Sequence, residues 1–381
     1  MDPGPLVDAL RPLGAAETAR YARQVMLPEF GVVGQERLAA ARVLVVGAGG
    51  LGSVTATYLA AAGVGTIGIV DDDVVDLSNL HRQVIHSQRD LGRAKVDSAV
   101  DRLAQVNPHV VVVRHRERLT AANARGVIAA YDLVVDGADN FATRYVVGDA
   151  CALEGRPHVW GSILRFDGQA SVWWPPHGPC YRCVFPAPPP SGSVLSCADA
   201  GVLGSLCATI GAACATEAIK VITGMGRTLV GRLLVHDALV QTYADLPLRR
   251  NPACALCGPR ATVREPGQGV LEACAAPVVD PARRVSVGEL AELVASGSVT
   301  LVDVREPAEW REGTIAGARG IPLGELAGAE VPSGPVVVFC AGGMRSQRAL
   351  AVLDRRGIAA RDLDGGIVAW RAAGQSVEMP A

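Results

Sequence analysis

Cys340 is the cysteine whose sequence neighbours most clearly point to chemistry. An apolar stretch, residues 336–339, ends at it, and a loop at 341–345 with two glycines and Arg345 separates it from a helix expected from about Ser346. Glycines let backbone N–H groups turn inward, and such a loop at a helix start favours an anionic sulfur. A thiolate there can attack a sulfur donor and keep the outer sulfur as a persulfide. The alternative is inert burial.

Gly47, Gly49, Gly50 and Gly52 form a second region of recognisable chemistry. They follow the apolar stretch 43–46 and lie at the start of a segment that is expected to be helical. Asp71 comes directly after the next apolar stretch, 66–70. Glycines at this spacing permit a tight turn and bring phosphate close to the N–H groups of a helix start. An acid placed like Asp71 can also hold ribose hydroxyls, so this pattern alone is compatible with NAD and an oxidoreductase.

Three residues downstream favour a triphosphate instead. Arg82 and Lys95 can neutralise phosphate oxygens and stabilise the charge that develops as pyrophosphate leaves, and Asp139 can hold a bridging Mg²⁺. The alternative is that both cations simply lie on a helix surface. The residues that accompany them, and that we assign to the same nucleotide site, are Asp72, Asp73, Ser78, Asn79, Leu80, His81, Gln83 and Asn140.

Four other cysteines have the spacing of metal ligands. They form two Cys-x-x-Cys pairs, each near turn-forming residues: Cys180 with Cys183, and Cys254 with Cys257. Two such pairs together make a tetrahedral thiolate site, which predicts zinc. Because four protein ligands leave no open coordination position, the zinc is expected to be structural.

The remaining cysteines carry weaker signals. Cys207 and Cys214 are seven residues apart, which places them on one helical face, so both are expected to be buried as small apolar residues. Cys197 follows a proline-rich stretch, and burial is one explanation for it as well. Cys151 and Cys274 belong to no pattern that indicates chemistry.

The apolar pattern predicts the elements that position these residues. Short apolar strands alternate with helical segments, which predicts a doubly wound α/β domain with a mostly parallel sheet. The strands are expected at 43–46, 66–70, 110–113 and 133–135. An extended crossover rich in proline and glycine is expected at 173–196, and loss of periodicity at 260–282 marks a linker. The domains are therefore expected at 1–259 and 283–381, the second being a smaller α/β unit.

Size and charge set broad limits. At 381 residues the chain exceeds what one core supports, and ten cysteines without a recognisable secretory leader indicate a cytoplasmic setting. A net charge of −2 argues against a nucleic-acid partner. Residues 43–70 lack charge and are long enough to cross a membrane, but seven glycines divide them into strand, turn, helix and strand. We therefore expect no membrane segment.

Residues 20–258 resemble a known family, the ubiquitin-activating-like adenylyltransferases of the MoeB/ThiF type. The matching residues, in the family's order and spacing, are Arg20, Tyr21, Arg23, Gln24, the glycine turn, 78–82, Lys95, Asp139, Asn140, Cys180 and Cys183. The resemblance implies a Rossmann-like fold and a homodimer in which Arg23 reaches into the partner subunit's site. The residues that it assigns to Mg-ATP are Gly50, Asp71, Asn79, Arg82, Lys95 and Asp139.

The implied reaction is adenylation of the C-terminal glycine carboxylate of a small carrier protein. A carboxylate is a poor acyl donor until one oxygen becomes part of a leaving group such as AMP. The enzyme then needs to align the carboxylate with the α-phosphate and to stabilise charge. The resemblance also gives Cys197 a function, because relatives carry a cysteine there that can join the activated carrier by a thioester or persulfide linkage.

Residues 284–373 resemble a rhodanese domain. The motifs that carry the resemblance lie at 301–310, 313–318, 340–345 and 363–370. Because Cys340 is present, the resemblance implies an active sulfurtransferase rather than a degenerate binding module. Asp303 and Arg305 are expected to brace the cysteine loop rather than to take part in chemistry.

The fused arrangement resembles the MoeZ-type adenylyltransferase/sulfurtransferases. It implies ATP, Mg²⁺ and structural Zn²⁺ as cofactors, and as partner a ubiquitin-like sulfur carrier ending in Gly-Gly, whose carboxylate becomes a thiocarboxylate. The sulfur donor would be thiosulfate or a cysteine desulfurase persulfide, and molybdopterin biosynthesis is one pathway such carriers serve. Two alternatives are an NAD-dependent oxidoreductase fused to a redox-sensing rhodanese module, and a non-catalytic scaffold that binds carriers.

Overall fold

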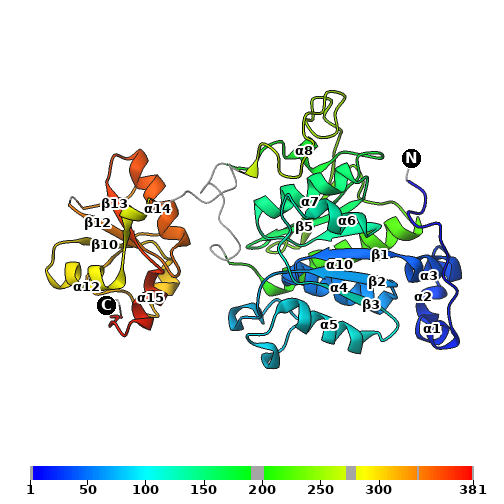
Figure 1. The fold of residues 1–381 in the computed structure, drawn as a ribbon, viewed down its shortest axis with the longest axis horizontal. Helices are drawn as coiled ribbons and strands as arrows, with labels where there is room; N and C mark the ends of the chain where they lie inside the picture. Colours follow the sequence, from blue (N-terminus) through cyan, green and yellow to red (C-terminus); the bar gives the residue numbers. More distant parts are fainter. Residues whose placement is uncertain (1–2, 190–200, 272–279, 333, 380–381) are drawn as a thin grey trace. The chain divides into compact units, whose positions relative to one another are not determined.

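The computed structural model describes residues 3–189, 201–271, 280–332 and 334–379. The chain divides near residue 274 into two compact units, each built on its own sheet (Figure 1). Both units are α/β, as the sequence predicts.

The first unit contains an eight-stranded sheet in the order β3-β2-β1-β4-β5-β6-β7-β8. Its strands are β1 (Arg42–Val46), β2 (Thr66–Val70), β3 (Val111–His115), β4 (Leu133–Asp136), β5 (His158–Leu164), β6 (Asp167–Trp173), β7 (Arg232–Asp237) and β8 (Thr242–Pro247). The first five in this spatial order are parallel, and β6 to β8 are antiparallel.

The apolar run of β1 is continuous because both faces of the sheet are covered. Val43 and Val45 belong to one buried cluster, which α4 and α10 share, whereas Leu44 and Val46 belong to another on the opposite face. Successive strand residues point to opposite faces, so a strand between two helical layers has no position left for a polar residue.

The helices of the first unit cover both faces of the sheet (Figure 1). They are α1 (Ala15–Arg20), α2 (Ala22–Val25), α3 (Gly31–Ala40), α4 (Gly50–Ala62), α5 (Lys95–Val106), α6 (Ala124–Ala129), α7 (Phe141–Leu153), α8 (Tyr181–Val184) and α10 (Gly204–Thr223), with short 3₁₀ turns at Leu77–Asn79 and Gln88–Asp90.

Within the described part of the chain, α10 alone has the length and apolar composition needed to cross a membrane. It packs against α4, β5 and β6, and 61% of its apolar window is buried inside the unit. Its position is that of a core helix. Cys207 and Cys214 lie on its buried face, as predicted, and burial raises the pKa of Cys214 to about 12.

The sheet is mostly parallel, as the sequence predicts, but its last three strands in spatial order are antiparallel. The strands β5 and β6 are joined by a two-residue hairpin turn, Arg165 and Phe166, with Arg165 at a φ of 54°. A turn this short can only reverse the chain, so β6 pairs antiparallel to β5. Part of the expected crossover at 173–196 is the end of β6 and the short helix α8; residues 190–200, which include Cys197, lie outside the described residues.

The first unit extends further along the chain than the sequence suggests. Of the predicted linker, residues 260–271 pack onto the first unit, where Val263 and Val270 are buried. The two buried valines hold the first half of the predicted linker against the first unit. The division near residue 274 therefore lies inside that linker.

The second unit has a five-stranded parallel sheet in the order β11-β10-β12-β13-β9. Its elements are β9 (Arg284–Val285), α12 (Val287–Ala295), β10 (Thr300–Asp303), α13 (Pro307–Trp310), β11 (Arg319–Gly320), β12 (Val336–Phe339), α14 (Met344–Arg355), β13 (Ala360–Leu363) and α15 (Gly366–Ala372), after a 3₁₀ turn at Pro281–Arg283. The central strand β12 is fully buried and leads directly into Cys340.

Candidate functional sites

The turn between β1 and α4 can be formed only by glycine at two of its positions. Gly47 has a φ of 86°, and a Cβ on Gly52 would lie 1.7 Å from the carbonyl oxygen of Gly47. This contact brings the start of α4 directly against the end of β1. The first N–H groups of a thirteen-residue helix then face the end of the strand, where an anion can be bound.

A half-buried carboxylate and a buried imidazole hold Ala48 in the middle of this turn. The Asp71 carboxylate accepts a hydrogen bond from the Ala48 N–H at 2.8 Å, and His86 Nε2 lies 3.0 Å from the Ala48 carbonyl oxygen. Burial raises the pKa of Asp71 and lowers the pKa of His86. Asp71 thus both supports the turn and faces the cavity. His86, which the sequence analysis does not single out, supports the turn as a neutral imidazole.

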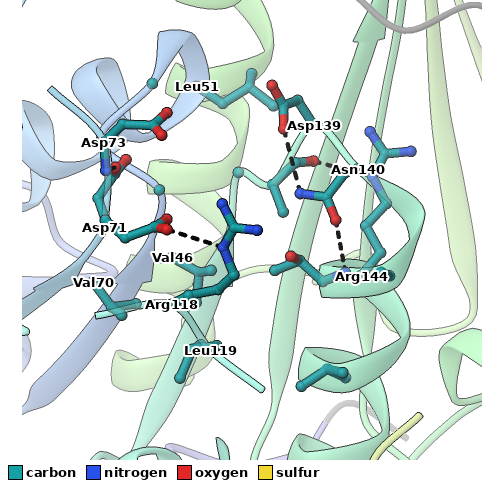
Figure 2. Close-up of a pocket in the computed structure, with 18 of the residues that line it drawn as sticks. Val46, Leu51, Val70, Asp71, Asp73, Arg118, Leu119, Asp139, Asn140 and Arg144 are labelled. Carbon is teal, nitrogen blue, oxygen red and sulfur yellow. Dashed lines mark hydrogen bonds and ion pairs between the residues drawn. The ribbon is translucent and has the colours of Figure 1, made fainter. Parts of the chain in front are cut away.

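A cavity of about 560 Å³ opens in front of the turn. This volume is within the range that nucleotide-sized ligands occupy. Figure 2 shows Asp71 and Asp73 on one wall and Asp139, Asn140 and Arg144 on the other, with Arg118 between them. The predicted residues that line it are Gly47, Gly49, Gly50, Asp71, Asp72, Asp73, Arg82, Gln83, Lys95, Asp139 and Asn140.

The predicted cations line the cavity and already have partners. The Lys95 ammonium lies 2.9 Å from the Asp73 carboxylate, and this lysine is nearly buried at the start of α5. Arg82 donates to the Ser78 carbonyl at 3.0 Å and lies 2.8 Å from His81 Nε2. A polyphosphate, which carries several negative charges close together, would be a stronger partner for both cations.

Other predicted residues lie beside the cavity rather than in its wall. Ser78, Asn79, Leu80 and His81 form the turn that supports Arg82 and are not among the residues that line the cavity. Arg23 is exposed on α2, also outside the lining. Its predicted role in a partner subunit's site stays a prediction.

Arg118, Arg144 and Leu271 are among the lining residues that the sequence analysis did not predict. Arg118 pairs with Asp72 at 2.9 Å, and Leu271 comes from the predicted linker. Arg144 is buried, donates to the Ala138 carbonyl and lies over an aromatic ring of Trp160. These residues carry no local motif, because they reach the cavity only through tertiary packing.

Asp139 and Asn140 occupy the loop that leads from β4 to α7. The side-chain oxygen Oδ1 of Asn140 accepts a hydrogen bond from the Thr143 N–H at 2.9 Å and thereby caps α7, which fixes the loop. Asp139 is exposed to the cavity. Carboxylates on two facing walls, Asp139 on one and Asp71 and Asp73 on the other, are oxygen donors of the kind that Mg²⁺ prefers, so the residues fit this ion together with a nucleotide.

The two cysteine pairs meet, although 71 residues separate Cys183 from Cys254 in the sequence. Their sulfur atoms lie within 4.8 Å of one another, with Cys180 3.5 Å from Cys254 and Cys183 3.4 Å from Cys257. A regular tetrahedron of sulfurs around zinc has edges of about 3.8 Å. The cluster therefore fits a tetrahedral metal ion.

The charge balance of the cysteine cluster also suits a cation. Interaction with the Cys180 thiol lowers the pKa of Cys257 to about 5, and the same interaction together with burial raises the pKa of Cys180. One thiolate is thus favoured without a metal, whereas four thiolates in this space require a positive ion.

Cys340 lies at the carboxyl end of β12 in a backbone cradle. The Gly343 N–H donates to its sulfur at 3.1 Å, and Gly343, at a φ of 101°, caps α14. The Ser346 hydroxyl lies 3.7 Å from the sulfur. Helix α14 therefore starts immediately beside the sulfur, and the positive end of its dipole points towards the sulfur.

Two arginines near the cysteine loop are each paired with a carboxylate. Arg345 forms two hydrogen bonds to Glu309, at 2.6 and 2.7 Å. Arg305 pairs with Asp303, and both are buried at the end of β10. Since β10 and β12 are neighbours, this pair stabilises the strand end from which Cys340 projects.

The first unit therefore belongs to the class of nucleotide-binding α/β enzymes, and the second has the thiol cradle of a sulfurtransferase domain. Residues 21–256 match the ThiF family, and residues 286–373 match the rhodanese-like domain. The chain belongs to the ThiF family, in a form that carries a C-terminal rhodanese-like domain.

Individual relatives agree with this assignment. The probable adenylyltransferase/sulfurtransferase MoeZ of Mycobacterium tuberculosis (strain ATCC 25618 / H37Rv) is 48% identical, with 96% of each chain covered. A sulfur carrier protein adenylyltransferase of Thermus thermophilus is 52% identical, covering 65% of this chain and 94% of that protein. The crystal structure of E. coli MccB with MccA-N7isoASN has a TM-score of 0.57 at 23% identity, covers 63% of this chain and 74% of that one, and is similar in fold alone.

Substitution of Cys183 by Ser should remove the metal and destabilise the first unit. A hydroxyl is a poor zinc ligand, and the cluster joins two segments that are distant in sequence. We expect metal analysis to show less than stoichiometric zinc and the Tm of the first unit to fall by about 8 °C, or about 2–3 kcal/mol for a domain of this size. Substitution of the buried Cys151 by Ser is the control for zinc content. Stoichiometric zinc in Cys183→Ser would contradict the assignment.

His86 should make the stability of the first unit sensitive to acid. Because burial lowers the pKa of His86 in the folded chain, the unfolded chain binds the proton more readily as pH falls through the ordinary histidine range. Stability from the neutral imidazole is therefore complete above that range and is lost below it. We expect wild type to be more stable than His86→Gln at pH 7.5, by about 1 kcal/mol, and this advantage to shrink by pH 5.5 in denaturant titrations. A constant difference would contradict the role of a neutral His86.

Proposed function

We propose that this chain activates the C-terminal glycine carboxylate of a small ubiquitin-like sulfur carrier with ATP and then converts it to a thiocarboxylate. The observation that carries the proposal is that one chain holds both a cavity lined by the glycine turn, Arg82 and Lys95, and a thiol, Cys340, that accepts a backbone N–H. Relatives named for adenylyltransferase and sulfurtransferase activity match nearly its whole length.

In the first step the carrier carboxylate attacks the α-phosphorus of ATP, the bond to the β-phosphate oxygen breaks, and pyrophosphate leaves. Arg82 and Lys95 release Ser78 and Asp73 and neutralise the leaving group. The N–H groups at the start of α4 hold phosphate oxygens. Mg²⁺, when bound near Asp139, supplies further charge neutralisation. The product is an acyl-adenylate, in which AMP is a good leaving group.

In the second step sulfur reaches the acyl carbon through Cys340. Its thiolate attacks the outer sulfur of a donor such as thiosulfate, sulfite leaves, and a persulfide remains. The terminal sulfur then attacks the acyl-adenylate, AMP leaves, and an acyl disulfide forms. A thiol attacks the Cys340 sulfur, the carrier thiocarboxylate leaves, and a further thiol reduces the resulting disulfide. The reductant supplies two electrons in total.

Further parts of the proposal rest on the family resemblance. Cys197, outside the described residues, is a candidate for the attacking thiol or for transient capture of the carrier. The homodimer would bring Arg23 into the partner subunit's cavity. Zinc in the four-cysteine cluster would be structural, and the reducing conditions that the chemistry needs agree with a cytoplasmic location. The competing NAD-dependent oxidoreductase has no support from the family match.

The test of the whole proposal is intact mass spectrometry of a carrier ending in Gly-Gly after incubation with the enzyme, Mg-ATP, thiosulfate and a thiol reductant. We expect one carrier oxygen to be replaced by sulfur. Cys340→Ala should reduce this product to background while leaving ATP–pyrophosphate exchange unchanged, because the thiol acts only after adenylation. Equal thiocarboxylate formation by the variant would remove Cys340 from the reaction.

Asp139→Ala should lower carrier-dependent ATP–pyrophosphate exchange by about a hundredfold or more. The carboxylate is the predicted Mg²⁺ ligand on its wall of the cavity, and loss of one charge-stabilising group in such a site has an effect of this size. Asp101→Ala, which removes an exposed carboxylate from α5 at a surface ion pair with Arg93, is the matched control and should keep full exchange. Normal exchange by Asp139→Ala would exclude the metal role.

A further inference from the structure

The segment that follows the second cysteine pair joins three buried clusters of the first unit in turn. Val263 packs with Cys180 and Cys254 in the cysteine cluster. Val270 packs with the aromatic cluster that contains Trp160 and Tyr181. The next residue, Leu271, packs against the cluster beneath the nucleotide cavity and lines that cavity. Residues 263–271 therefore form a connected path from the cysteine cluster to the cavity.

A buried ion pair anchors this segment between its two ends. Arg182, which stands between the ligands Cys180 and Cys183, donates to both carboxylate oxygens of Asp149, at 2.7 and 2.6 Å. The same carboxylate accepts from the Gly267 N–H at 2.7 Å, and Arg182 also donates to the Gln268 carbonyl at 3.0 Å. Arg182 and Asp149 are 5% and 1% exposed.

This ion pair holds the backbone of the segment in place as well as neutralising charge. The Arg182 guanidinium can bond to both Asp149 oxygens and to the Gln268 carbonyl in only one arrangement, and burying the Asp149 carboxylate is costly unless all of these bonds form. The position of Gly267 and Gln268 is thereby set, and Leu271 follows only three residues later. The side chain of Leu271 is half-buried, so part of its surface is available inside the cavity.

The cavity has a charged part and an apolar part. The glycine turn, Arg82, Lys95 and the carboxylates form the charged part, which suits a polyphosphate. The apolar residues that line the cavity and belong to the cluster contacting Leu271 are Val46, Val70, Leu119 and Val146. Figure 2 shows Val46, Val70 and Leu119 together on one side of the site, away from Asp139. An apolar surface next to a phosphate site suits the flat face of a nucleobase.

We propose that Leu271 is a binding residue for the nucleoside end of the nucleotide, and that Arg182 is a positioning residue that holds it there. This inference rests on the proposed use of ATP and deepens it. Residues 263–271 are then part of the nucleotide site, and the four-cysteine cluster is physically connected to that site through Arg182.

The direct test compares two ligands on the full-length protein by calorimetry: the magnesium complex of α,β-methylene ATP, and magnesium tripolyphosphate, which lacks a nucleoside. Leu271→Ala should raise the Kd of the ATP analogue about tenfold, the effect of removing most of one leucine contact. The Kd of tripolyphosphate should not change. Leu234→Ala, a half-buried leucine on β7 outside the cavity, is the control and should leave both Kd values unchanged.

Arg182→Lys tests the positioning role, because lysine keeps the charge but cannot make the bidentate contact together with the Gln268 contact. We expect the KM for ATP in pyrophosphate exchange to rise about tenfold with kcat unchanged. The double variant Arg182→Lys/Leu271→Ala should bind the ATP analogue no more weakly than Leu271→Ala alone, since both changes remove the same contact. If Arg182 had only a structural role, Arg182→Lys would lower Tm without raising KM selectively over kcat. The effects of the two substitutions on the Kd of the ATP analogue would then be additive.

The outcomes separate the inference from the function on which it rests. Wild-type exchange activity together with equal ATP-analogue affinity in wild type and Leu271→Ala would overturn the inference alone. Equal weakening of the ATP analogue and tripolyphosphate by Leu271→Ala would overturn the nucleoside contact. A wild-type protein that performs no ATP–pyrophosphate exchange with any carrier would overturn the proposed function and the inference with it.

Discussion

The first unit depends on the contact between the Gly47 carbonyl and the backbone of Gly52. It leaves no room for a side chain, so the end of β1 and the start of α4 are packed backbone to backbone. Asp71 and His86 hold the turn through Ala48, and Arg82 and Lys95 line the same cavity as the turn. A larger residue at Gly52 would displace α4 and the charged wall together.

The mixed sheet explains how one domain provides both the cavity in front of the glycine turn and the four-cysteine cluster. The parallel half ends its strands at the cavity, as open α/β sheets generally do. The antiparallel half, from β6 to β8, carries the chain away and returns it, so that the second cysteine pair meets the first. The segment after this meeting point then runs back to the cavity and reaches it at Leu271.

Short sequence motifs predicted those parts of the sites that are formed by a few consecutive residues. The glycine turn, the two Cys-x-x-Cys pairs and the Cys340 loop all depend on spacing within a few residues, and the structure brings each of them together as expected. Arg82, Lys95 and Asp139 also line the cavity, although their chemical roles remain predictions. The fold class was recognisable because buried parallel strands appear as continuous apolar runs.

The features that were missed depend on contacts between distant segments. His86 is important because of Ala48, 38 residues away, and Leu271 because Asp149 and Arg182 hold its segment. No periodicity marks 260–271, so the segment looked like a linker, yet two valines and a buried ion pair fix it. The antiparallel strands were missed because a two-residue turn at Arg165 carries no glycine or asparagine signal.

Helix α15 packs against the cysteine loop and holds two of its carbonyl groups in place. The Ile367 and Val368 N–H groups donate to the carbonyl oxygens of Cys340 and Ala341, and a Cβ on Gly366 would lie 2.4 Å from the Cys340 oxygen. These carbonyls are therefore turned away from the sulfur and cannot rotate towards it. The Gly343 N–H already points at the sulfur, so the persulfide proposed for Cys340 would need little reorganisation of the loop.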